Sequence, residues 1–242
     1  MIIRLYHCTL TMPSRQSPML ITIDNVLNAQ QLAQVKTLLQ KAKFIDGKLS
    51  AGMAAKKVKN NEEAAQDASL HQQLNQIVMG SLVQHPTFQL AALPHRVATP
   101  FYARYRKGMT YGDHVDDPVM GPPGGHYRSD VSTTIFLNSP DEYEGGELVV
   151  RTPFGDQKTK LEAGAAVVYP SASLHHVAEV ISGERLVAVT WTQSMVRDAA
   201  KRELLYELGT AREALLRGNA DSDETKKVDV SYVNLVRMWA EI

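Results

Sequence analysis

Apolar residues near the start of the chain change from strand-like alternation to helical spacing. Met19–Asp24 alternates apolar with other residues, which predicts a short strand. Asn28 resembles a helix N-cap, and Gln31 completes the pattern of a capping box. A repeat of about 3.6 residues then predicts an amphipathic helix over residues 29–42. The apolar positions of this helix are Leu32, Val35, Leu38, Leu39 and Ala42.

A second helical pattern follows a polar connection. Apolar residues recur at helical spacing over residues 70–82, and Pro86 is expected to stop this helix. We expect both helices to pack outside a sheet and support it. The connection, residues 46–66, contains Gly47 and Gly52 and is predicted to be irregular. We interpret its lysines as solvated surface, and the alternative is substrate contact at the mouth of a barrel. These lysines are Lys56, Lys57 and Lys59.

From Phe101 onward the pattern is typical of short β-strands separated by polar turns. Many short strands of this kind predict an antiparallel sandwich or barrel. Residues 117–126 are rich in proline and glycine, which predicts a loop without regular structure, either a lid or a plain surface loop. The predicted strands are Phe101–Tyr105, Val131–Leu137, Glu147–Thr152, Ala165–Tyr169 and Leu186–Thr192.

The pattern becomes helical again after Trp191. Asp198 can cap a helix whose apolar positions run from Leu204 to Leu215, with Gly218 just past its end. Residues 220–227 are polar and charged, which favours a linker, and a last amphipathic helix follows it up to Trp239. Its apolar stripe could pack on the sheet domain or mediate self-association as a homo-oligomer.

Composition and charge exclude several classes of protein. Lysine plus arginine equals aspartate plus glutamate, 26 each, so nothing suggests electrostatic attraction to nucleic acid or to an anionic membrane. No apolar run approaches the roughly 18–20 residues of a membrane span. Cys8 is the single cysteine, so no intramolecular disulfide can form, which agrees with a reducing cytoplasm.

The main chemical candidate is the tripeptide His114-x-Asp116. Side chains two residues apart on a strand share one face, so both could bind one ion. A third ligand from the downstream His175-His176 pair would complete two histidines and one carboxylate, the set that suits Fe(II) in oxygen-activating enzymes. Arg185 on the next predicted strand can hold a carboxylate in bidentate fashion. The tripeptide alone is also typical of an edge strand that faces solvent, and Arg185 is what favours a 2-oxoglutarate-dependent oxygenase.

Longer motifs surround these residues, among them Tyr-Arg-Lys-Gly-Met-x-Tyr-Gly-x-His-x-Asp, which ends at Asp116. The complete set is Phe101–Asp116, Arg128–Leu137, Tyr143–Leu148, Tyr169–His175, Gly183–Arg185 and Trp191–Asp198. Together they resemble the bacterial PKHD-type hydroxylases, a branch of the Fe(II)/2-oxoglutarate dioxygenases related to prolyl 4-hydroxylases. The resemblance extends from about Met19 to Ile242.

The resemblance implies a mainly β protein with flanking helices, an α+β fold whose core is a double-stranded β-helix, or jelly roll. Residues 19–197 would form the dioxygenase domain with its N-terminal supporting helices, and residues 198–242 a small C-terminal helical region. Residues 1–18 lie outside the resemblance, and we expect them to be a disordered extension or the product of a mis-assigned translation start.

The resemblance also implies what the site residues do. His114, Asp116 and His175 would hold Fe(II), leaving positions for 2-oxoglutarate and dioxygen. Arg185 would bind the distal carboxylate of 2-oxoglutarate, which is converted to succinate and carbon dioxide as a C–H bond is hydroxylated. Tyr105 lies where relatives often place a hydroxyl near 2-oxoglutarate, although a buried strand aromatic is an equally good interpretation. Ascorbate would help to maintain Fe(II). The substrate stays open between a peptide prolyl residue and a small iron-chelating metabolite.

Other polar residues near the motif are expected to lie outside the metal site. Adjacent strand residues face opposite sides, so His176 should point away from the metal if His175 binds it. Asp113 is expected to face away for the same reason. Arg104 and Arg106 are expected to be solvated, and His126 is expected to lie at the surface or contact substrate.

Two other functional classes remain open from the residues alone. A divalent-metal hydrolase could use the same three ligands to activate water, with Arg185 binding a substrate carboxylate or phosphate. A non-catalytic jelly-roll protein could bind iron without turnover. Neither explains the wider motifs, so an Fe(II)- and 2-oxoglutarate-dependent hydroxylase is the preferred prediction.

Overall fold

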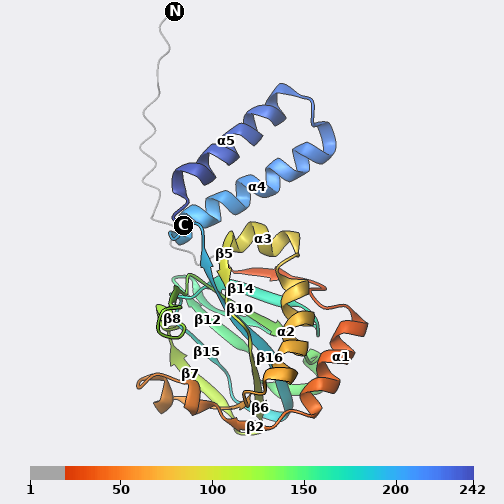
Figure 1. The fold of residues 1–242 in the computed structure, drawn as a ribbon, viewed down its shortest axis with the longest axis vertical. Coiled ribbons are helices and arrows are strands. Elements are labelled where there is room, and N and C mark those ends of the chain that lie inside the picture. The colour runs from red at the N-terminus through yellow and green to blue at the C-terminus, as the bar shows by residue number, and fades with distance from the viewer. Residues whose placement is uncertain (1–19) are drawn as a thin grey trace, which may run out of the picture.

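Two antiparallel sheets form the centre of the fold in the computed structural model, which describes residues 20–242 (Figure 1). The larger sheet has nine strands, in the order β1-β14-β10-β16-β6-β4-β2, with β5 and β11 also paired to β16. The smaller sheet has five strands, in the order β13-β12-β15-β7-β3. The extension predicted over residues 1–18 lies outside the described residues.

The strands predicted from alternation all belong to these sheets. The larger sheet contains β1 Ile21–Ile23, β2 Phe44–Asp46, β4 Glu62–Ala64, β5 Pro94–Val97, β6 Phe101–Arg106, β10 Val131–Phe136, β11 Tyr143–Gly145, β14 Ala166–Pro170 and β16 Val180–Ser194. The smaller sheet contains β3 Lys59–Asn60, β7 Thr110–His114, β12 Leu148–Thr152, β13 Gly155–Thr159 and β15 His175–Val177.

The larger sheet is buried on both faces. Neighbouring residues of its strands belong to different hydrophobic clusters, as Ile135 and Phe136 of β10 do, because strand side chains alternate between faces. One cluster includes residues of the first three helices, and the other includes residues of the smaller sheet such as Leu148 and Val150. The predicted sandwich with outer supporting helices is therefore confirmed.

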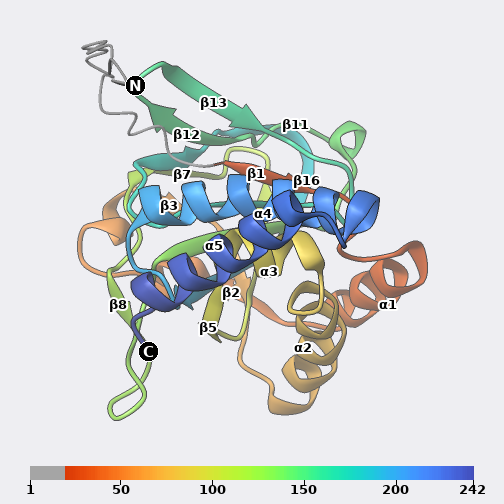
Figure 2. The ribbon, with the colours of Figure 1, turned by 90° about the horizontal axis from the view of Figure 1, so that it is seen from above.

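Three helices cover the outer face of the larger sheet (Figure 2). They are α1 Ala29–Gln40, α2 Ala68–Leu82 and α3 Pro86–Ala92. The capping box of Asn28 and Gln31 is present at the start of α1, as predicted. Pro86 does not merely stop the preceding helix, because it occupies the first turn of α3, where its missing N–H and fixed φ are tolerated.

The prediction that residues 46–66 form an irregular connection was wrong in part. It contains β3 and β4 and two short 3₁₀ turns, Gly47–Ser50 and Ala55–Lys57. Strand β3 pairs with β7 and strand β4 with β6, so these short strands exist because the edges of the two sheets offer them partners. Lys56 and Lys57 are exposed as predicted, whereas Lys59 is buried, with 7% of its surface exposed.

The proline- and glycine-rich segment is also more regular than predicted. It forms a small two-stranded ribbon, in which β8 Val119–Met120 pairs with β9 Tyr127–Arg128. The turn between these strands holds Gly121 and Gly124, both at positive φ, which glycine adopts without steric cost. The ribbon confines this segment to a hairpin.

The C-terminal residues form a helical hairpin that projects from the sheets (Figure 1). Its helices are α4 Ala199–Asn219 and α5 Asp223–Trp239, and Asp198 caps α4 as predicted. The prediction of a linker over residues 220–227 was wrong, because α5 begins at Asp223 with Ser222 as its N-cap. Gly218 was predicted to lie just past the end of the preceding helix, but it lies inside α4. No helix among residues 20–242 is long and apolar enough to cross a membrane. Self-association through this hairpin stays a prediction.

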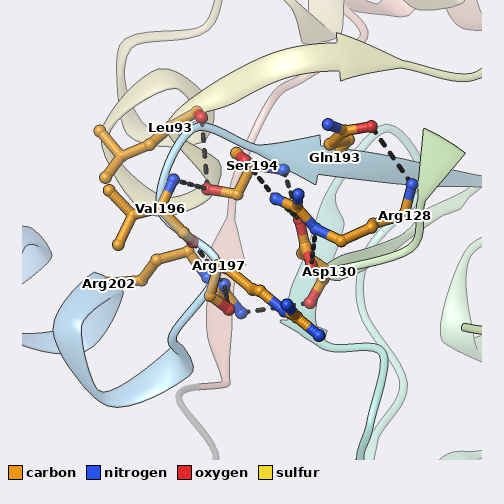
Figure 3. A network of polar contacts seen from close by, with 8 residues as sticks. All are labelled: Leu93, Arg128, Asp130, Gln193, Ser194, Val196, Arg197 and Arg202. Atoms are coloured by element: carbon orange, nitrogen blue, oxygen red, sulfur yellow. Dashed lines mark hydrogen bonds and ion pairs between the residues drawn. The ribbon is translucent and has the colours of Figure 1, made fainter. Parts of the chain in front are cut away.

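Arg202 of α4 joins the hairpin to the larger sheet (Figure 3). Its guanidinium donates to the backbone carbonyls of Val196 (2.8 Å), Arg197 (2.7 Å) and Asp130 (3.1 Å). The Asp130 carboxylate in turn accepts from the backbone N–H of Ser194 at 2.9 Å. The Asp130 carbonyl also accepts from the backbone N–H of Ser171 at 3.2 Å, whereas the carbonyls of Val196 and Arg197 depend on the buried side chain of Arg202.

Replacing Arg202 should therefore destabilise the protein. Arg202→Met keeps much of the volume but leaves the buried carbonyl of Val196 and the partly buried carbonyl of Arg197 without this donor, so we expect the free energy of unfolding to fall by about 2–3 kcal/mol. Chemical denaturation measures this loss. Arg217→Met on the exposed end of α4 is the matched control and should change stability by no more than about 0.5 kcal/mol. Equal effects of the two substitutions would contradict the anchoring role.

Candidate active site

A cavity of about 610 Å³ lies between the two sheets. The smaller sheet contributes His114 and His175 to its wall, and the larger sheet contributes Tyr105, Tyr169 and Arg185. The site therefore depends on side chains that point inward from both sheets. The ribbon of β8 and β9 also borders the cavity, and its closure over a substrate stays a prediction.

Three candidate metal ligands converge in this cavity: His114, Asp116 and His175. We call these three residues the metal cluster. Their candidate ligand atoms all lie within 4.8 Å of one another. The Nε2 atom of each histidine lies 3.9 Å from Oδ1 of Asp116. His114 stands directly opposite His175 in the pairing of β7 with β15, whereas Asp116 follows two residues after the end of β7. The expectation that one strand carries both His114 and Asp116 was therefore wrong, although their side chains still meet.

Hydrogen bonds orient both imidazoles toward the same point. Nδ1 of His114 lies 2.8 Å from the carbonyl oxygen of Gly112, and Nδ1 of His175 lies 2.9 Å from that of Ser173. Because a carbonyl only accepts, each Nδ1 carries the proton and each Nε2 keeps its lone pair for a metal. On the third ligand, Oδ2 of Asp116 accepts from the hydroxyl of Ser132 at 2.5 Å.

Electrostatics keep the His114 imidazole neutral. Burial, followed by the neighbouring His175, lowers the pKa of His114 to about 4. A metal ligand must be deprotonated, so His114 is ready to bind an ion at neutral pH without first losing a proton. The aromatic ring of Tyr111 stacks on this imidazole, with ring centres 3.6 Å apart and planes 11° from parallel.

Arg185 is a buried cation without an acidic partner among residues 20–242. It lies on β16 opposite Tyr105 of β6, and only 1% of its surface is exposed. No carboxylate of the described chain forms an ion pair with it, and its Nε has no hydrogen-bond partner there. Its guanidinium carbon lies 5.0 Å from the ring centre of Tyr105. Burying an unpaired charge costs several kcal/mol, so this arrangement favours an anionic ligand.

Tyr105 lies on the same wall of the cavity as Arg185. Burial raises its pKa to about 12, so its hydroxyl is protonated at neutral pH and can donate a hydrogen bond. The positive charge of Arg185 and the polar side chain of Asn61 act in the opposite direction on this pKa.

The remaining polar residues near the motif lie away from the metal cluster, with one departure from expectation. Nδ1 of His176 lies 3.0 Å from a carboxylate oxygen of Asp113, as strand alternation predicts for two residues facing outward. His126 and Arg106 are exposed. Arg104 was predicted to be solvated, but it is half-buried, because it pairs with Glu62 at 2.6 Å.

Sequence reasoning missed a buried polar group in the cavity wall. Lys59, Asn61 and Glu63 all line the cavity and are buried. Their spacing of two residues is the pattern of a single strand face, so alternation could have indicated it. The signal was obscured because the segment is short and its side chains are of the kind usually found in solvent.

Comparisons with known proteins identify the class and then the family. The 2OG-Fe(II) oxygenase superfamily matches residues 100–193, and the PKHD-type hydroxylase C-terminal domain matches residues 199–241. A solved structure, the viral collagen prolyl hydroxylase of Paramecium bursaria Chlorella virus 1 with 2-oxoglutarate, is similar with a TM-score of 0.51 and 18% identity. The similarity covers 72% of this chain and 96% of that chain. Fold and site thus define a 2-oxoglutarate–Fe(II) oxygenase with a jelly-roll core.

Relatives of known family are much closer in sequence. A PKHD-type hydroxylase of Thioalkalivibrio sulfidiphilus is 54% identical over 224 residues, which is 93% of this chain and all of that protein. A PKHD-type hydroxylase of Acaryochloris marina is 47% identical over 223 residues, 92% of this chain and all of that protein. The chain belongs to the PKHD-type hydroxylases. It is therefore an Fe(II)- and 2-oxoglutarate-dependent hydroxylase, and this membership disfavours the hydrolase and non-catalytic alternatives.

The two adjacent histidines give a direct test of the metal cluster. His175→Ala removes a donor atom of the cluster, so we expect metal affinity to fall by more than about a hundredfold, beyond what loss of an outer-shell partner costs. His176→Ala is the matched control and should leave the affinity unchanged. Anaerobic calorimetric titration with Mn²⁺ as a redox-stable probe measures both. The opposite result would show that the strand register places the other histidine in the cluster.

Proposed function

We propose that His114, Asp116 and His175 bind Fe(II) and that Arg185 binds the distal carboxylate of 2-oxoglutarate. Two imidazole nitrogens and one carboxylate oxygen are the donor set that suits Fe(II) in oxygen-activating enzymes. When bound, the iron and 2-oxoglutarate supply hydroxylation of a substrate C–H bond by dioxygen, with release of succinate and carbon dioxide. The fit of the donor atoms supports this proposal, since all of them lie within 4.8 Å of one another.

The observation that carries the proposal is the buried charge of Arg185, which has no acidic partner among residues 20–242. Its guanidinium is buried in the wall of the same cavity that holds the metal cluster. A bidentate carboxylate would satisfy it and offset the cost of its burial. A dicarboxylate with a keto group at one end could reach the cluster with that end and Arg185 with the other.

The other residues of the cavity would orient and shield the cosubstrate. We assign Tyr105 as a donor to 2-oxoglutarate, because its hydroxyl stays protonated and it faces Arg185 across the β6–β16 pair. Ser132 would hold the Asp116 carboxylate in its binding orientation. Apolar strand residues such as Leu148 and Val189 would exclude water from the reacting centre. Ascorbate would keep the iron in the Fe(II) state.

The substrate would be a small molecule or a peptide that enters between the sheets. A cavity of about 610 Å³ leaves room for a substrate group beside the cosubstrate. A peptide prolyl residue and a small iron-chelating metabolite are the two candidates that the family likeness suggests. The balanced formal charge of the chain gives no support for a nucleic-acid partner. We place the enzyme in the cytoplasm. A chain with one cysteine cannot form an intramolecular disulfide, which agrees with a reducing compartment.

Anaerobic titration tests the proposal. Addition of Fe(II) and then 2-oxoglutarate to metal-free protein should produce a visible metal-to-ligand charge-transfer band that requires both additions. Asp116→Ala should abolish the band because it removes the carboxylate ligand. Zinc binding without such a band would favour the hydrolase, and absence of metal binding would favour a non-catalytic jelly roll.

The same band measures the contribution of Arg185. Arg185→Ala should weaken 2-oxoglutarate binding at least about thirtyfold, because truncating one partner of a buried charge pair costs 2 kcal/mol or more. Arg106→Ala, on the neighbouring strand but exposed, is the control and should bind normally. Unchanged affinity in Arg185→Ala would exclude Arg185 as the carboxylate clamp. Succinate formation stimulated by candidate substrates then identifies the reaction.

A further inference from the structure

We propose that the β3–β4 crossover, residues 59–63, is a positioning element that aligns the metal-binding and 2-oxoglutarate-binding ends of the cavity. The inference rests on the proposed function of the cavity. Its three side chains that line the cavity are Lys59, Asn61 and Glu63. They form no hydrogen bond or ion pair with a residue of the metal cluster or with Arg185. They act instead through Tyr111 and Tyr105.

The crossover connects the two sheets directly at the cavity. Lys59 pairs with Tyr111 of β7 in the smaller sheet, and Glu63 pairs with Ala103 of β6 in the larger sheet. The chain therefore passes from one sheet to the other between these residues. A displacement of the crossover would move both walls of the site relative to each other.

An ion pair joins the two ends of the crossover, Lys59 and Glu63. Nζ of Lys59 lies 2.5 Å from Oε1 of Glu63 and 2.9 Å from Oγ of Ser50. The side chains of Lys59 and Glu63 are only 8% and 11% exposed. Replacing such a buried pair by apolar residues of similar volume is often neutral or even stabilising, because desolvation of the two charges is costly. The pair is therefore better explained by the geometry it imposes than by the stability it contributes.

One end of the crossover supports a metal ligand. Nζ of Lys59 lies 5.3 Å from the ring centre of Tyr111, over the ring that stacks on His114. Attraction between the ammonium and the electron-rich ring fixes the ring, and the ring limits rotation of the imidazole. Lys59 thus acts on the orientation of His114 without touching the ion.

The middle of the crossover supports the 2-oxoglutarate end. The polar side chain of Asn61 lines the cavity beside Tyr105 and lowers the pKa of its hydroxyl, and the ring of Tyr105 lies under the Arg185 guanidinium. The Oδ1 atom of Asn61 is buried without a hydrogen-bond partner in the described chain. Asn61 can occupy this place because Gly47 has no side chain, and a Cβ at that position would overlap the Asn61 amide. The backbone N–H of Gly47 also donates to the Asn61 carbonyl at 2.9 Å, which fixes the residue further.

The test replaces the ion pair by apolar residues of similar size. In Lys59→Met/Glu63→Leu we expect the thermal midpoint to change by no more than a few degrees, which corresponds to about 1 kcal/mol. The dissociation constant for 2-oxoglutarate should rise about tenfold or more, and the charge-transfer band should shift, as expected when groups behind the ligands are lost. Lys59→Arg, which keeps the charge pair, should retain both properties. Lys36→Met breaks an exposed Lys–Glu ion pair and is the matched control.

A second variant keeps the proposal testable if the double replacement does not fold. Asn61→Ala removes the polar side chain that acts on the Tyr105 hydroxyl and leaves the ion pair in place, so it should weaken 2-oxoglutarate binding with little effect on Mn²⁺ affinity. If the native protein shows no charge-transfer band, the proposed function itself fails. If the native band is present and the folded variants match it in position and in 2-oxoglutarate affinity, the positioning role is overturned.

Discussion

The pairing of β7 with β15 sets the geometry of the site, because it places His114 directly opposite His175 on the smaller sheet. Asp116 meets them only because the chain turns out of β7 immediately afterwards. Arg185 and Tyr105 stand on the larger sheet, where the β6–β16 pair holds them side by side. The active site therefore lies between the two sheets. Its dimensions depend on the distance between the sheets, which the packed apolar residues set.

Charged side chains in the cavity lack partners that bound ligands would supply. The Lys59–Glu63 pair is neutral in itself, whereas Arg185 has no acidic partner in the described chain and Asp116 faces His114, which burial keeps neutral. A divalent metal and a dicarboxylate cosubstrate would supply the missing partners. Ligands that bind only the folded state also stabilise it, so binding of iron and 2-oxoglutarate should offset the cost of these buried charges.

Local pattern was sufficient for much of the fold. Period-two alternation located the five main strands, and helical spacing with Asn28 and Asp198 as caps located α1 and α4. These features are encoded by neighbouring residues, because side-chain alternation and capping are local interactions. The metal and carboxylate chemistry proposed for the site also comes from residue identity, since the side chains of His114, Asp116, His175 and Arg185 limit what they can bind.

The sequence by itself determined the class of fold, the family and the candidate ligands, because motifs and periodicity are properties of short segments. Only the tertiary structure decided which polar residues enter the cavity. Lys59 was expected in solvent but is buried, since β3 and β4 form only where the edges of β7 and β6 offer hydrogen bonds. Short strands such as β3 and β4 depend on partner strands far along the chain, and no local pattern encodes those partners.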